Sequence, residues 1–82
     1  MAWKTRFSKE IGTEWLKIKI EGSGLIESSH GNLRYVLGEE KPTDEFIGTV
    51  QEEGVEHEFY NQTVWIRAGE GKALVSVQDL EE

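Results

Sequence analysis

The alternation of apolar and polar residues along much of this 82-residue chain is the feature that most restricts its fold. Residues 16–20, 33–37, 55–60, 64–68 and 73–77 each repeat one kind of side chain at every second position. A period of two places the two sets of side chains on opposite faces of a β-strand, whereas a helix requires a period near 3.6. The pattern therefore predicts strands over most of the chain.

Turn-forming residues separate these segments. Residues 22–24 are Gly-Ser-Gly and residues 29–32 are Ser-His-Gly-Asn, the only proline lies in the loop 38–44, and residues 69–72 have the glycines of a tight hairpin connection. The best helix candidate, residues 8–17, contains Gly and Thr in its middle, which disfavours a helix. We therefore predict an all-β fold, a small antiparallel β-sandwich or barrel of about six to seven short strands.

The length predicts a single β domain over residues 1–82, with a thin hydrophobic core. Within this domain we expect residues 1–13 to form an N-terminal arm and residues 79–82 to form a frayed acidic tail. The chain has no cysteine, so no disulfide reinforces it. Sheet pairing, large aromatic residues and oligomerisation remain as sources of stability.

The net charge of −7 is distributed unevenly along the chain. Residues 1–20 hold five basic and two acidic residues, whereas residues 21–82 hold four basic and fourteen acidic residues. An acidic body disfavours binding to phosphates, so we expect no nucleic-acid partner. Two interpretations of the charge stay open: it serves solubility, or the basic start of the chain docks against an acidic neighbour such as a second copy.

No stretch of the sequence approaches the roughly 20 apolar residues of a membrane-spanning helix. The first residues also lack the apolar run of a signal peptide. We therefore expect a soluble protein made in the cytoplasm, with no membrane partner.

Each residue group that could carry chemistry has a plainer interpretation. Residues 28–30 combine two hydroxyls with an imidazole, but neighbours in a turn rarely aim at each other as nucleophile and base. His57 points to the opposite strand face from the glutamates that flank it, so the three side chains do not converge on one metal ion. The acidic pairs in predicted loops form a solvated rim. We expect no catalytic residue, no metal site, no cofactor and no enzymatic activity.

Aromatic and basic side chains on outward strand faces are the best binding candidates. Trp65 and Arg67 lie opposite the apolar residues of their strand, and Trp15 likewise shares a face with two lysines. Exposed Trp beside Arg is the composition of interface hot spots. In the alternative interpretation, Trp packs under a loop or across a cross-strand pair, with Arg stacked on its ring. The candidate interface residues are Trp3, Trp15, His57, Tyr60, Trp65 and Arg67.

Residues 33–78 show a further pattern. The segments Tyr35-Val36-Leu37-Gly38 and Lys41-Pro42-Thr43 precede Phe59-Tyr60 and the closing run VWIRAGEGKALVSVQ. This arrangement resembles the small β-sandwich virion proteins of tailed bacteriophages, which decorate heads, fibres or tail tips. The resemblance implies a non-enzymatic structural or accessory protein located in the virion and made in the host bacterial cytoplasm. It also implies a symmetric homo-oligomer, with a trimer favoured, that docks to a larger virion protein.

Two other functions remain open at this point. Trp15, Trp65 and Tyr60 are suitable stacking platforms for a glycan or another small ligand, which makes a carbohydrate-binding module the first alternative. The fourteen acidic residues after position 20 make an acidic inhibitor that mimics nucleic acid the second. Mimicry requires carboxylates in ordered rows, which loop-clustered pairs do not promise.

Overall fold

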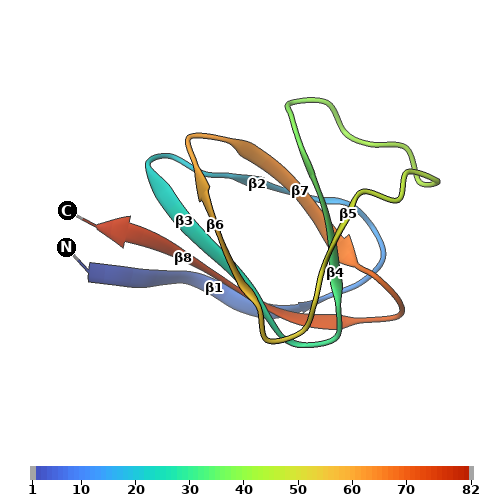
Figure 1. Cartoon of the computed structure of the whole chain (residues 1–82), viewed down its shortest axis with the longest axis horizontal. Helices are drawn as coiled ribbons and strands as arrows, with labels where there is room; N and C mark the ends of the chain where they lie inside the picture. The colour runs from blue at the N-terminus through green and yellow to red at the C-terminus, as the bar shows by residue number, and fades with distance from the viewer. Residues whose placement is uncertain (1, 82) are drawn as a thin grey trace.

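Two four-stranded antiparallel sheets pack face to face in the computed structural model, which describes residues 2–81 (Figure 1). Sheet A has the strand order β1-β8-β3-β6 and sheet B the order β2-β7-β4-β5. The strands are β1 (Ala2–Ile11), β2 (Leu16–Lys19), β3 (Ser23–His30), β4 (Leu33–Leu37), β5 (Thr49–Gln51), β6 (Glu56–Tyr60), β7 (Thr63–Ala68) and β8 (Ala73–Glu81). The predicted all-β sandwich is confirmed, with eight strands instead of six or seven.

Short connections carry the chain from one sheet to the other and set which strands face each other. Turns of two to four residues join β1 to β2, β3 to β4, β5 to β6 and β7 to β8. In each pair, the two strands hold corresponding positions in their sheets. The sandwich therefore has two open sides: β1 and β2 bound one of them, and β5 and β6 bound the other.

The core consists of the apolar side chains that alternate inward from both sheets. Val75 and Val77 of β8 and Val64 of β7 have no exposed surface, and Ile26 of β3 is equally buried. Full burial of each such side chain stabilises the fold by about 1.5–3 kcal/mol. The inward-facing side chains of the period-two pattern thus form the contact between the two sheets.

The chain turns a corner where β2 leads into β3 and β6 leads into β7. Backbone hydrogen bonds between Ile20 and Gln62, at 2.8 and 3.1 Å, continue the strand pairing from sheet B into sheet A. Asn61 adopts a left-handed backbone with φ of 46°, and its side chain accepts a hydrogen bond of 2.7 Å from the Gly22 nitrogen. Such bends let strands pass between the layers of a sandwich.

Both ends of the chain differ from the sequence prediction. The expected N-terminal arm is largely strand β1, which pairs with β8 from Ala2 opposite Glu81 to Ile11 opposite Ala73. Residues 79–81 of the expected frayed tail belong to β8, and Glu82 lies outside the described residues. The alternation of β1 was not visible because most of its side chains are exposed and a β-bulge shifts its register between residues 5 and 7.

An ion pair supports this terminal ribbon. The Arg6 guanidinium donates hydrogen bonds of 2.8 and 2.6 Å to the Asp79 carboxylate across the β1–β8 pair. These bonds hold the pKa of the Asp79 carboxyl below its ordinary value. The two chain ends therefore leave the sandwich side by side (Figure 1).

We predict that Asn61→Val destabilises the corner more than Asn61→Gly. A β-branched residue is strained by about 1–2 kcal/mol in a left-handed backbone, whereas glycine adopts it freely. Both variants lose the hydrogen bond to Gly22, so their difference isolates the backbone strain. Urea unfolding measures it, and equal stability of the two variants would contradict the assigned corner geometry.

We also predict that Asp79 makes folding stability depend on pH in the acid range. Because its pKa is lower in the folded state, its contribution is complete above the ordinary carboxyl pKa of about 3.9 and is lost as pH falls through the folded value. The stability difference between the wild type and Asp79→Asn should shrink as the pH is lowered from about 5 to about 3. A difference that stays constant over that range would refute this role.

Candidate functional site

The loop of residues 38–48 crosses the outer face of sheet B, and we call it the strap. Two tryptophans of that face hold its backbone. The indole nitrogen of Trp65 donates to the Gly38 carbonyl at 3.0 Å, and that of Trp15 donates to the Thr43 carbonyl at 3.0 Å. Both rings therefore anchor the strap.

Arg67 of β7 completes this attachment. Its guanidinium lies 4.3 Å from the Trp15 ring and donates to the carbonyls of Asp44, at 2.9 Å, and Phe46, at 2.6 Å. The strap bends back towards β5 at Gly48, where an added Cβ would come within 2.7 Å of the Tyr35 carbonyl. The outer face of β7 thus fixes the middle of the strap, and a close backbone approach fixes its end.

This geometry matches the alternative in which Trp packs under a loop with Arg stacked on its ring. Trp15 is only 6% exposed, while Trp65 and Arg67 are half-buried. All three side chains do point away from the sheet interface, as the alternation predicted. The sequence could not show that the loop would fold back over them.

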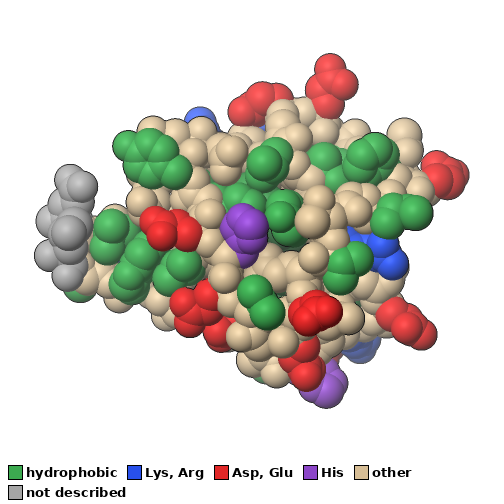
Figure 2. All heavy atoms as spheres, viewed as in Figure 1, with side chains coloured by type: hydrophobic (Ala, Val, Ile, Leu, Met, Phe, Trp, Pro, Cys, Tyr) green, Lys and Arg blue, Asp and Glu red, His purple; other side chains and the backbone are tan. Residues whose placement is uncertain are grey.

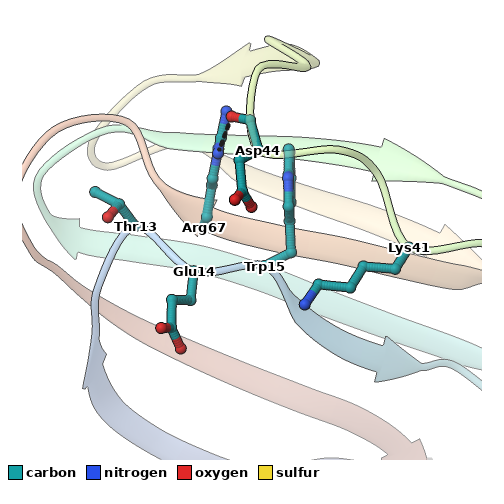
Figure 3. A pocket seen from close by; sticks show the side chains of 6 residues that line it. All are labelled: Thr13, Glu14, Trp15, Lys41, Asp44 and Arg67. Atoms are coloured by element: carbon teal, nitrogen blue, oxygen red, sulfur yellow. Dashed lines mark hydrogen bonds between the residues drawn. The ribbon is translucent and has the colours of Figure 1, made fainter.

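A polar cavity of about 500 Å³ opens where the strap meets the start of β2 (Figure 3). It is lined by Thr13, Glu14, Trp15, Lys41, Asp44 and Arg67. The two cations and two carboxylates give it no dominant charge, and both terminal nitrogens of Arg67 are bonded to the strap. Across residues 2–81, no group of three His, Asp or Glu side chains is placed to hold a metal ion.

The hydroxyl and imidazole groups at 28–30 belong to the end of β3, next to the two-residue turn at 31–32. Ser28 is fully buried, and its hydroxyl lies within hydrogen-bond distance of the backbone carbonyls of His30, at 2.9 Å, and Gly31. The imidazole of His30 instead lies 3.7 Å from the Glu53 carboxylate. The serine and the histidine are therefore not arranged as a nucleophile and its base.

Aromatic rings of β6 and β4 contact each other between the two sheets. His57 stacks on Phe59 with ring centroids 4.4 Å apart, and Tyr35 from the opposite sheet lies 5.2 Å from His57. Nearby, the Gln51 amide donates hydrogen bonds of 2.7 Å to the carbonyls of Ile26 and Val55, which joins the two sheets. His57 is thus a half-buried residue between the sheets.

Exposed apolar side chains are concentrated along the same stretch of chain. Six of the eight large exposed hydrophobic residues lie between positions 37 and 60. They are Leu37, Phe46, Ile47, Val50, Val55 and Tyr60, and we call this set the apolar edge. Figure 2 shows hydrophobic side chains interspersed with Asp and Glu on one face of the molecule.

The apolar edge is the feature that sequence reasoning missed. β5 begins only at Thr49, so Phe46 and Ile47 lie before the strand, and Ile47 is 63% exposed. The alternation predicted a strand over residues 55–60, yet β6 begins at Glu56 and leaves Val55 in the preceding turn. One sequence signal could have indicated this exposure: the apolar segment 46–50 is short and lies between the acidic pairs at 44–45 and 52–53.

The remaining candidates, Trp3 and Tyr60, point outward from sheet A. Trp3 pairs with Leu80 across the β1–β8 ladder and is 40% exposed, while Tyr60 is 65% exposed on the edge strand β6. The six candidate residues therefore occupy three places: under the strap, between the sheets, and on the outer face of sheet A.

In comparisons with protein-family models, curated proteins and solved structures, no match to this chain was found. Residues 2–81 contain no helix long and apolar enough to cross a membrane.

We predict that Arg67→Leu releases the strap. The substitution removes two hydrogen bonds worth about 0.5–1.5 kcal/mol each, so protease cleavage within residues 38–48 should accelerate on the order of tenfold. The fluorescence emission of Trp15 should shift to the red because its ring becomes exposed to water. Arg34→Leu is the matched control, because Arg34 lies directly opposite Arg67 on β4. Equal cleavage of both variants would contradict the attachment.

Proposed function

We propose that this chain is a non-enzymatic structural protein that acts by assembling with other protein subunits through the apolar edge. In line with its sequence resemblance, we propose a virion accessory role in a tailed bacteriophage, as a homo-oligomer docked to a larger virion protein. The observation that carries the proposal is that six of the eight large exposed apolar side chains lie between the end of β4 and the end of β6.

Two physical arguments support an assembly role. Large exposed apolar patches with a polar rim are typical of protein-binding surfaces, because isolated exposed hydrophobics are normally scattered. The apolar edge is bordered by acidic pairs at 39–40, 44–45 and 52–53, which supply such a rim. A small domain with a thin core also gains stability from a partner subunit.

The carbohydrate alternative has less support. Trp15 and Trp65 use their indole nitrogens to hold the strap, and Trp15 is buried, so neither ring offers a free stacking face of the kind a sugar platform requires. Only Trp3 and Tyr60 keep substantial exposure among the aromatic candidates. Titration with a glycan panel, followed by Trp fluorescence, tests this alternative separately.

We predict that the double variant Ile47→Asp, Val50→Asp loses self-association. Hydrated carboxylates in place of two exposed apolar side chains should weaken an interface about tenfold or more. Sedimentation velocity over a range of protein concentrations measures the assembled fraction, and circular dichroism checks the fold. Leu74→Asp is the control, because Leu74 is 41% exposed but lies on β8, away from the apolar edge. A wild type that stays monomeric and matches the double variant would contradict the proposal.

A further inference from the structure

We infer that the apolar edge receives an extended, basic segment of a different protein, in a groove between the end of β4 and the end of the strap. The inference rests on the proposed assembly function and adds the chemistry of the partner. The groove has a volume of about 490 Å³ and shares no lining residue with the polar cavity. Its lining residues are Tyr35, Val36, Leu37, Phe46, Gly48 and Thr49.

The groove exists because the strap leaves the end of β4 and returns close to this strand only at Gly48. In Figure 1, the strap swings away from the end of β4 before it reaches β5. At Gly48 it comes so close that an added Cβ would lie 2.7 Å from the Tyr35 carbonyl and 3.0 Å from a methyl group of Val36. Two half-exposed apolar side chains, Leu37 and Phe46, line the groove beyond this point. Such a hollow accommodates the apolar anchor side chain of a partner.

The end of β4 has an unpaired backbone on the groove side. The Gly38 nitrogen donates to a β7 carbonyl at 3.0 Å. Because backbone groups of successive strand residues point to alternate sides, Leu37 directs its N–H and C=O away from β7. β5 pairs with β4 only as far as Thr49 opposite Tyr35, and no backbone group of the described residues bonds to Leu37 on that side. An extended chain laid in the groove can therefore pair with Leu37, as in strand addition to an exposed edge.

The charge around the groove selects a basic segment. Residues 38–58 hold eight acidic residues and one basic residue, a net charge of −7. The basic residue, Lys41, lines the polar cavity instead (Figure 3). The exposed carboxylates of Glu40 and Glu45, on the strap, form no ion pair with the described residues. Charge complementarity thus favours Lys or Arg beside the apolar anchor.

A second copy of this chain is a poor source of such a segment. Its strands β1 and β2 are basic, but their cationic side chains are engaged within the chain. Lys4, Arg6 and Lys19 form ion pairs, and Lys9 and Lys17 lie over aromatic rings. The partner is therefore a different, basic protein, such as the larger virion protein of the proposed function. The apolar edge has four further residues that do not line the groove and stay free for contact between copies: Ile47, Val50, Val55 and Tyr60.

Binding of labelled peptides tests the inference. The probe is a fluorescein-labelled peptide of alternating Lys and Leu, and the controls are the same peptide with Glu for Lys or with Ser for Leu. Fluorescence anisotropy should show binding of the Lys-Leu peptide alone, weakened at least about fivefold by Phe46→Ser. The double variant Glu40→Gln, Glu45→Gln should weaken binding about three- to tenfold and reduce its dependence on NaCl concentration. Glu14→Gln, Glu70→Gln is the matched control, because it removes the same charge outside the groove. Circular dichroism checks the fold of each variant.

Hydrogen exchange of single amides reports where the peptide binds. With saturating Lys-Leu peptide, the Leu37 amide should exchange more slowly by on the order of tenfold, because its N–H gains a hydrogen-bond partner. The neighbouring Gly38 amide should not change, because it is already bonded to β7.

Each contrary result has a definite meaning. If the peptide binds but leaves the Leu37 amide unprotected and is insensitive to Phe46→Ser, it binds a general acidic surface and the inference is wrong. Equal binding of the Glu-Leu peptide also contradicts it. If the Leu37 amide becomes protected when the protein concentration alone is raised, the occupant is a second copy, so the inference is wrong while the assembly function stands. Absence of any peptide binding overturns this inference alone, since sedimentation of the Ile47→Asp, Val50→Asp variant tests the proposed function without a peptide.

Discussion

The two-sided packing of β7 is the constraint on which the rest of the structure depends. Its inward residues Val64, Ile66 and Ala68 are buried against sheet A, so they fix the contact between the layers. Its outward residues Trp65 and Arg67 bind the strap. Because successive side chains of a strand point to opposite faces, one short segment organises both the core and the outer layer.

The strap covers the outer face of sheet B, so the outer face of sheet A and the two open sides of the sandwich remain exposed. A sandwich of two four-stranded sheets has four edge strands. An edge strand can pair with a strand of another chain unless it is charged, very short or covered by another segment. Here residues 38–58, with the strap, β5 and the start of β6, hold eight acidic residues and one basic residue, and most of the large exposed apolar residues follow the same stretch of chain. The proposed function follows from this combination of apolar and acidic side chains.

The parts of the fold that depend on local pattern were predictable. Alternation identified the strands around Ile18, Tyr35, Ile66 and Val75, because each has one buried and one solvated face. The strand β1 was not predictable, because solvent reaches most of its side chains and a bulge interrupts its period. Pattern alone does not reveal a strand on which only Phe7 and Ile11 pack against the core.

The residue types of the candidate site were predictable from the sequence, but the burial and surroundings of these residues were not. The sequence indicated that Trp15, Trp65 and Arg67 point outward, yet their burial depends on the path of the strap, which is a long-range contact. The apolar edge depends on where β5 starts, and that boundary is set by the left-handed turn at Gly48, with φ of 73°. The sequence thus identified candidate residues, whereas tertiary contacts determine which of them are buried and which are exposed.

Hydrogen exchange at low and high protein concentration tests most directly the central claim that this chain assembles through the apolar edge. We predict that backbone amides of β5 and β6 gain protection at high concentration, while those of β7 in the interior of sheet B do not change. Equal exchange of the β5 and β6 amides at both concentrations would contradict the claim.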